Sequence, residues 1–404
     1  MNNTGHVNNC IRFLALGFAL ALLSPGNAYG QAKVGATVEQ PLSLSNSARS
    51  LALGGAASTL VDEYSGLHNP GALALFYLDN YLSVTAPLSV DTWPDISFKS
   101  FAVGGGWALT PMNAGEKRSP RVALAGSYTQ AVLDIEIVQT TSSNPFGENP
   151  PTFFTASEVV EYFSLGLGVD YTVQAGIGAT LRRGRSILED TKSPWDNHVD
   201  FGAHVSFPLG EILWSPRAHD ISRNRVFMDI SLAFVSFYRT PRINESIIVD
   251  GAIIQVSPNA DPSDRTNRFG ASLFWGIGNT YVNHLSLRAV YDRLTNPELI
   301  FLGSLLSRQF EQDMYGLELG LSDALFVRGG RSLERDANQW GVGVNVSRLA
   351  QAIIPGSGAR YRSTASSSFL QSVDLKIDVA RIDRDSDLLD DVTYLNLSLS
   401  LGRF

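Results

Sequence analysis

The charged side chains that could act together are concentrated in the last third of the sequence. Glu318, Arg328, Asp374, Lys376 and Asp378 lie in the strand-like stretches YGLELGL, ALFVRGG and VDLKIDVA. Alternate residues of a strand point to the same face, so these five side chains could meet on one polar surface. Because an unpaired buried charge is costly, the pattern predicts an ion network. Ligand binding by its carboxylates is the alternative.

Catalytic chemistry is not indicated elsewhere in the chain. The six histidines are scattered, and His198, His204, His219 and His284 lack the spacing of metal ligands. The sequence contains no Gly-x-Ser-x-Gly elbow and no phosphate-binding loop. We therefore expect no enzymatic activity, no metal and no cofactor.

Two further polar clusters have a possible ligand. DRDSD, residues 383–387, places carboxylates at alternate positions as a calcium loop does, but Leu388 and Tyr394 replace the glycine and glutamate that such a loop needs. We expect an acidic external loop, with adventitious calcium as the alternative. LRRGR, residues 181–185, is expected to be a solvated strand end; contact with lipopolysaccharide phosphate or an anionic ligand is the alternative.

Composition and the first thirty residues predict an exported protein. The net charge is −8 and only 17% of residues are charged, which argues against nucleic-acid binding. Arg12 precedes the apolar run Phe13 to Leu23, which is shorter than the ~20 residues of a retained membrane anchor. Residues 1–30 therefore read as a signal peptide cleaved before Gln31. The single cysteine, Cys10, lies within it.

After the signal, polar and apolar residues alternate in segments of about ten residues. A soluble adhesive β-sandwich would alternate too and is one alternative. Charges at strand centres favour a wet lumen, with Leu375 and Val344 facing lipid and Lys376 and Asn345 facing inward. Residues 81–404 thus predict an all-β, transmembrane antiparallel β-barrel of about 14 strands. The predicted strands are 81–90, 97–110, 121–138, 160–171, 172–185, 198–207, 225–238, 266–277, 282–292, 312–321, 324–331, 338–347, 370–381 and 392–402.

The lengths of the connections agree with both chain ends being periplasmic. Tight turns are predicted at Asp170-Tyr171, at Gly278 to Thr280 and at Ser322-Asp323. Long connections, expected outside the cell, fall at 139–159, 186–197, 239–265, 293–311 and 382–391. Two connections are long where turns are expected, 208–224 and 348–369.

Residues 31–80 precede the first strand and are predicted to form a hatch. A barrel of about 14 strands has a lumen that its own wall cannot fill. The residues expected to fit the segment to the wall are small or polar: Gly54, Gly55, Asp62, Glu63, Tyr64, Asn69 and Pro70. The sequence Asn69-Pro70-Gly71 is expected to make the turn into the barrel.

The stretch SARSLALGGAASTLVDEYSGLHNPGALAL resembles the N-terminal signature of FadL-type and PorV/PorQ-type outer-membrane proteins. The hairpins between Tyr315 and Ala380 are similar to those near the C-terminus of these families. His68 stands where the families have an aromatic residue. Phe404 ends the chain as an assembly signal would, although it is out of phase with the last strand. The resemblance implies a 14-stranded barrel with an N-terminal hatch in the Gram-negative outer membrane, inserted by the barrel assembly machinery.

The resemblance implies one of two roles. The first is a type IX secretion component of the PorV/PorQ type, which would hold cargo or a partner protein through its external loops. The alternative is a FadL-like channel for hydrophobic small molecules. A polar lumen favours the secretion role, whereas an interruption in the wall or an apolar inner pocket would favour the channel.

Overall fold

The computed structural model describes residues 47–93, 96–110, 120–139, 152–171, 173–188, 191–192, 195–210, 225–238, 246–249, 252–255, 265–278, 283–295, 312–332, 337–353, 373–383 and 392–402. The predicted signal peptide, residues 31–46 of the predicted hatch, Phe404 and most of the DRDSD loop lie outside these residues.

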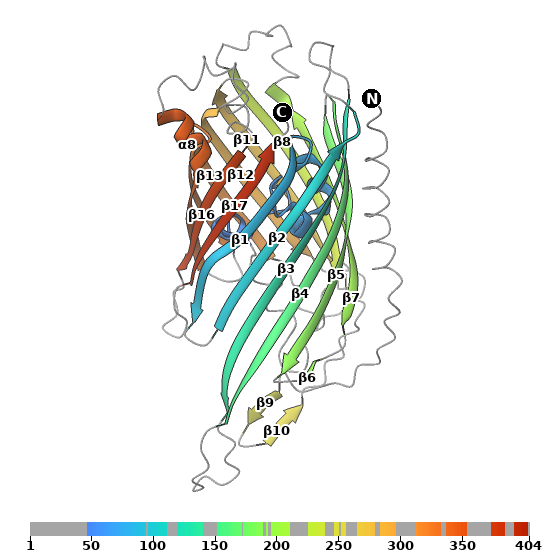
Figure 1. Ribbon diagram of the computed structural model, residues 1–404, viewed down its shortest axis with the longest axis vertical. Helices are drawn as coiled ribbons and strands as arrows, with labels where there is room; N and C mark the ends of the chain where they lie inside the picture. The colour runs from blue at the N-terminus through green and yellow to red at the C-terminus, as the bar shows by residue number, and fades with distance from the viewer. Residues whose placement is uncertain are drawn as a thin grey trace, which may run out of the picture.

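Among the described residues, 14 strands form a closed antiparallel barrel (Figure 1). β1 pairs with β17 and β4 pairs with β5, so the sheet has no free edge. A two-residue strand, β6 (Thr191–Lys192), adds to β5, and β9 (Ser246–Val249) pairs with β10 (Ala252–Gln255) apart from the wall. The wall strands are β1 (Asn80–Trp93), β2 (Ile96–Ala108), β3 (Arg121–Gln139), β4 (Thr152–Asp170), β5 (Gln174–Leu188), β7 (Asp196–Pro208), β8 (Arg225–Tyr238), β11 (Arg265–Gly278), β12 (Asn283–Thr295), β13 (Gln312–Leu321), β14 (Leu325–Ser332), β15 (Ala337–Asn345), β16 (Val373–Asp383) and β17 (Val392–Gly402).

The barrel has an apolar outside and a polar inside, the reverse of a soluble protein. On β13 the side chains of Leu317 and Leu319 are 51% and 41% exposed, whereas Glu318 between them is 5% exposed. The same alternation places buried serines on the inner face of β17. An apolar outer face suits hydrocarbon, and closed strand pairing satisfies the backbone there. The chain is a transmembrane β-barrel.

Each of the fourteen predicted segments is a wall strand, but some bounds were wrong. β4 begins at Thr152 and not near residue 160, so that β3 and β4 each have 19 residues and the loop between them is shorter than predicted. The strand predicted to end at 347 ends at Asn345, because helix α8 (Val346–Ile353) begins there. The Asn345 side chain accepts a hydrogen bond from the Arg348 backbone N–H at 3.0 Å, as an N-terminal cap does.

The two ends of the barrel differ. We call the end at which β1 begins and β17 ends the near rim, and the opposite end the far rim. The near rim carries helix α8 at the top of Figure 1, and the long strands β3 and β4 extend the far rim. The tight near-rim turn predicted at Ser322-Asp323 is present, and both residues have positive φ, 54° and 49°.

Residues 47–79, here called the inner segment, lie within the barrel (Figure 1, blue). They include the short helices α3 (Ala48–Ala52), α4 (Ser65–His68) and α5 (Pro70–Phe76). The turn predicted at Asn69-Pro70-Gly71 was wrong. Asn69 instead caps α5 by accepting the Gly71 N–H at 2.9 Å, and Pro70 occupies the first helical turn, where its missing N–H is harmless. In the part of the chain that the structure describes, no helix is long and apolar enough to cross a membrane.

Candidate functional site: the inner segment and the wall around it

Helix α5 packs on a row of glycines in the wall. Gly166, Gly178 and Gly202 are register partners on β4, β5 and β7, and their missing side chains would point inward. A Cβ at Gly178 would lie 2.3 Å from the Pro70 carbonyl oxygen, and one at Gly202 would lie 2.2 Å from the Asn69 side chain. Only glycine permits so close an approach of backbone to backbone.

Asn69 holds this contact in place with hydrogen bonds on both sides. Its side-chain N–H₂ donates to the Ser58 carbonyl at 2.8 Å and to the Ala203 carbonyl of β7 at 3.0 Å. Its side-chain oxygen is the cap of α5, so all of its polar atoms are used. Asn69 thereby joins the loop at Ser58 and the start of α5 to strand β7 of the wall.

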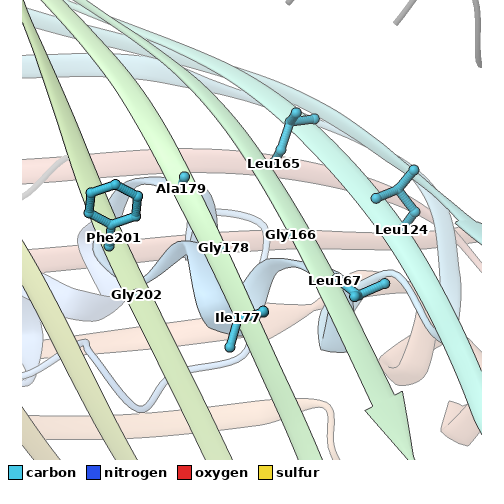
Figure 2. Close-up of a pocket in the computed structure, with 9 residues that line it drawn as sticks. All are labelled: Leu124, Leu165, Gly166, Leu167, Ile177, Gly178, Ala179, Phe201 and Gly202. Carbon is cyan, nitrogen blue, oxygen red and sulfur yellow. The ribbon is translucent and has the colours of Figure 1, made fainter. Parts of the chain in front are cut away.

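The outside of the same wall region is an apolar groove of about 510 Å³ (Figure 2). Small residues form its floor, with the inner segment visible behind the strands. Its lining residues are Leu124, Leu165, Gly166, Leu167, Ile177, Gly178, Ala179, Phe201 and Gly202. The wall is therefore only one backbone thick between α5 and the membrane.

The opposite end of the inner segment is held by charges. Arg49 of α3 donates to both carboxylate oxygens of Glu318, at 2.9 and 2.7 Å. Arg328 donates to Glu318 at 2.6 Å and also pairs with Asp378. Arg49 further lies 3.4 Å from Asp62. The structure thus brings together three of the five residues considered for the network, and adds Arg49, which the sequence pattern did not single out.

The other two members of the considered network lie apart from Glu318. Lys376 is 3.8 Å from the Glu63 carboxylate of the inner segment. Asp374 accepts from Asn345 at 3.2 Å and lies 3.8 Å from Arg348, near the base of helix α8. Lys376 nevertheless interacts electrostatically with Asp374 and Asp378, so the five residues are linked by charge, although the direct ion pairs among the described residues join Glu318, Arg328 and Asp378.

Asp292 on β12 is a contact that the sequence reasoning missed. Its carboxylate accepts the backbone N–H groups of Ala57 and Ser58 at 2.8 and 2.9 Å, and the Ser58 hydroxyl as well. Asp292 is fully buried. The alternation of β12 could have placed it inside the barrel, but nothing in the sequence showed which loop it binds.

Gly54 and Gly55 adopt the left-handed backbone conformation, with φ of 74° and 86°. A Cβ at Gly54 would lie 2.6 Å from the Tyr315 carbonyl oxygen of β13. Both the conformation and the close approach require glycine after α3. These residues let the chain leave α3 against the wall.

Tyr64 lies at the seam between β17 and β2. Its hydroxyl accepts the Asn396 side-chain N–H at 2.7 Å and is hydrogen-bonded to the Ser100 side chain. The tyrosine is 2% exposed. It thus joins the inner segment to two strands that flank β1 on either side.

Burial shifts two titratable groups of the inner segment in opposite directions. Burial, assisted by the neighbouring Glu63 carboxylate, raises the pKa of Asp62 to about 6. Burial lowers the pKa of His68 to about 3, and the Arg268 guanidinium acts in the same direction. Asp62 therefore takes up a proton more readily in the docked segment, and His68 less readily.

Known proteins resemble this chain only distantly. No family model and no curated protein match its sequence. The toluene transporter TodX of Pseudomonas putida has 10% identity and a TM-score of 0.41, covering 88% of this chain and 97% of its own. The toluene transporter TbuX of Ralstonia pickettii has 11% identity and a TM-score of 0.37, with 88% and 97% covered. The transport unit of the autotransporter AIDA-I of Escherichia coli has 11% identity and a TM-score of 0.36, with 80% and 90% covered. Similarities at this level support no conclusion about function.

Proposed function

We propose that this protein is an outer-membrane channel for small hydrophobic molecules, with residues 47–79 as its hatch. The observation that carries the proposal is an interruption of the wall between β1 and β2. The ladder pairs Thr85 with Ala102 and resumes only at Asp91 with Ser97. Across the same stretch β1 remains paired with β17, and β2 remains paired with β3.

The position of the interruption suits passage into hydrocarbon. Backbone groups without partners are costly in a bilayer, and a barrel otherwise avoids them by complete pairing. Pro87 lies within the interruption and cannot donate to a ladder. Leu397 on β17 and the outward-facing Phe101 on β2 flank it, so it faces the apolar band. A hydrophobic molecule could leave the lumen here without crossing water.

Tyr64 would close this route from inside. Asn396, which donates to the Tyr64 hydroxyl, is the register partner of Pro87. Ser100 lies within the unpaired stretch of β2. The Tyr64 contacts therefore span the interruption from β17 to β2. Release of Tyr64 would open the interruption between β1 and β2 to the lumen and would empty the part of the lumen that Tyr64 occupies.

The secretion role has no comparable support. A polar lumen favoured it in the sequence, but several polar side chains of the inner face bind the inner segment. Glu318 binds Arg49, and Asp292 binds the loop at Ser58. Part of the polarity of the lumen thus serves to bind the inner segment, and type IX secretion is an expectation from sequence resemblance alone.

The proposal is tested by sealing the interruption. Ala86→Cys with Phe101→Cys places two thiols across it, and Val84→Cys with Val103→Cys places two thiols on a paired position of the same strands. The only native cysteine is Cys10, within the predicted signal peptide. After closure with a short thiol cross-linker, uptake of radiolabelled oleate and toluene should fall at least tenfold in the first variant and return on reduction of a cleavable linker. The control pair should retain uptake. Unchanged uptake in the sealed variant would show that the molecules leave elsewhere.

A further inference from the structure

A cluster of arginine and aromatic side chains lies on the outer face of the barrel toward the far rim. The outward-facing residues of β5 run Ile177, Ala179, Leu181, Arg183 and Arg185, so that two cations follow directly on the apolar band. On β4 the outer face changes from apolar to charged residues at the same height, because Glu161 is the register partner of Arg183. This is the level at which a barrel passes from hydrocarbon to lipid headgroups.

Trp195 holds both arginines. The guanidinium carbons of Arg183 and Arg185 each lie 4.3 Å from the centre of the Trp195 ring. Contact with an aromatic face stabilises a guanidinium and fixes its plane. Tryptophan is also the residue that prefers the membrane interface. We call Arg183, Arg185 and Trp195 the arginine–tryptophan patch.

The charge of the patch is only partly compensated. Arg183 Nε lies 3.3 Å from Glu161, whose other oxygen accepts the Tyr128 hydroxyl at 3.2 Å. Within the described ranges no carboxylate lies at salt-bridge distance from Arg185, and its Nε is shielded from solvent without a hydrogen-bond partner. Within the described ranges, Arg183 thus has a carboxylate partner and the positive charge of Arg185 has none.

We propose that the arginine–tryptophan patch binds the phosphate group of a membrane lipid. Guanidinium groups bind phosphate through paired N–H donors, and the patch holds two guanidinium groups on the outer face of β5. The apolar groove of Figure 2 lies on the same outer face, along β4, β5 and β7. Ala179 and Phe201 line it, and Ala179 lies four residues before Arg183 on the outer face of β5. The patch and the groove thus lie along one face of β5, with Leu181 between them, where headgroup and acyl chain of one lipid can contact both.

The test compares lipids that differ in phosphate and variants that differ in one cation. The folded barrel in detergent is titrated with lipid A, with diacylglycerol, which has acyl chains and no phosphate, and with inorganic phosphate, and bound molecules are counted by native mass spectrometry. Arg185→Gln is compared with Lys99→Gln. Lys99 is an outward-facing cation at the same height on the barrel wall. Successive register pairs run from Lys99 to Val132, from Val132 to Val159 and from Val159 to Arg185. The Lys99 side chain is 67% exposed, and no stacking on an aromatic ring is found for it in the described residues.

The expected result is preferential binding of lipid A, weakened at least tenfold by Arg185→Gln and less than twofold by Lys99→Gln. Ala179→Phe, which fills the groove and keeps both arginines, should also weaken lipid A binding. Equal losses in the two glutamine variants would overturn the proposal in favour of general rim charge. Equal binding of lipid A and diacylglycerol would overturn the phosphate site and leave only an apolar groove. Inorganic phosphate binding as tightly as lipid A would mean a free-anion site. Heat-modifiable gel migration shows whether each variant is folded. Trp195→Phe keeps an aromatic ring beside both arginines and should therefore bind lipid A like the parent protein.

Discussion

The inner segment is held at its two ends by contacts of different physical kinds. At α5 the backbone of residues 70 and 71 rests on the wall glycines Gly176 and Gly178 with no side chain between them. At α3 the contact is a chain of ions in which Arg49 and Arg328 share Glu318. The first contact depends on shape and the second on charge.

The difference between the two contacts indicates which end of the inner segment can leave the wall. A steric fit between backbones has one geometry and is lost when an atom is added. An ion pair stabilises little beyond the cost of removing its charges from water, and water or another ion can replace a partner. We therefore expect the α3 end to release first, together with Tyr64, while α5 stays on the glycine row.

The largest effect is expected from filling the glycine row. Gly178→Val places a side chain where only 2.3 Å separates the Cβ position from the Pro70 carbonyl oxygen. Because that atom is backbone, the cost should exceed about 3 kcal/mol, roughly a hundredfold in docking. Conductance in planar bilayers should rise accordingly. Ala179→Val, one residue away on the outer face, should stay closed, and equal conductance of the two variants would mean that α5 does not close the lumen.

A smaller effect is expected from neutralising the centre of the ion chain. Glu318→Gln leaves Arg49 and Arg328 facing an amide, which still accepts one hydrogen bond, so docking of α3 should weaken by about 2 kcal/mol. Hydrogen–deuterium exchange should increase in residues 48–53 and remain unchanged in residues 70–76. Asp313→Asn, on the same strand but hydrogen-bonded to the half-buried, outward-facing Tyr291, is the control. Faster exchange at both ends would show that the inner segment opens as one unit.

Asp292 contacts residues 57 and 58, which lie between α3 and α5 in the sequence. Its substitution should weaken docking of the inner segment less than Glu318→Gln does. Asp292→Asn retains one acceptor oxygen for the Ala57 and Ser58 N–H groups but loses the charge. We expect a loss of about 1 kcal/mol, because a hydrogen bond to a neutral acceptor is weaker than one to a carboxylate. Exchange of the amides of residues 57 and 58 measures it. Protection equal to that of the parent protein would mean that the wall glycines alone fix this loop.

The smallest effect is expected from pH, because two groups oppose each other. The pKa of His68 is lowered to about 3 by burial, so its contribution to docking is lost as pH falls below 6.5. The pKa of Asp62 is raised to about 6, so docking gains as pH falls through 6 toward 3.8. Between pH 7 and pH 5 the parent protein should change conductance less than tenfold.

The two pH contributions can be separated by substitution. His68→Gln leaves only the Asp62 contribution, so the inner segment should be held more firmly at pH 5 than at pH 7. Asp62→Asn leaves only the His68 contribution, so the inner segment should be held less firmly at pH 5 than at pH 7. Conductance at the two pH values measures both variants, and identical pH profiles would mean that neither group titrates in the docked state.

Part of the site could be predicted from the sequence, and the limits have physical causes. Tyr64 and Asn69 are among the residues predicted to fit the inner segment to the wall, and both contact it. The helical caps were missed, because Asn-Pro-Gly is also a common turn and only the following contacts favour a helix. Arg49 was missed because its partner Glu318 is 269 residues away.

The sequence by itself determined the barrel. Strand number, strand position and the choice of inner and outer face follow from an alternation of period two, which is local and needs no knowledge of the rest of the chain. Only the tertiary structure decided how the barrel is filled. Contacts of α5 with Gly178, of Asp292 with Ser58 and of Tyr64 with Asn396 join residues that come together only when the barrel closes. The interruption beside Pro87 is likewise a property of two strands together, because a proline in one strand does not show which neighbour it leaves unpaired.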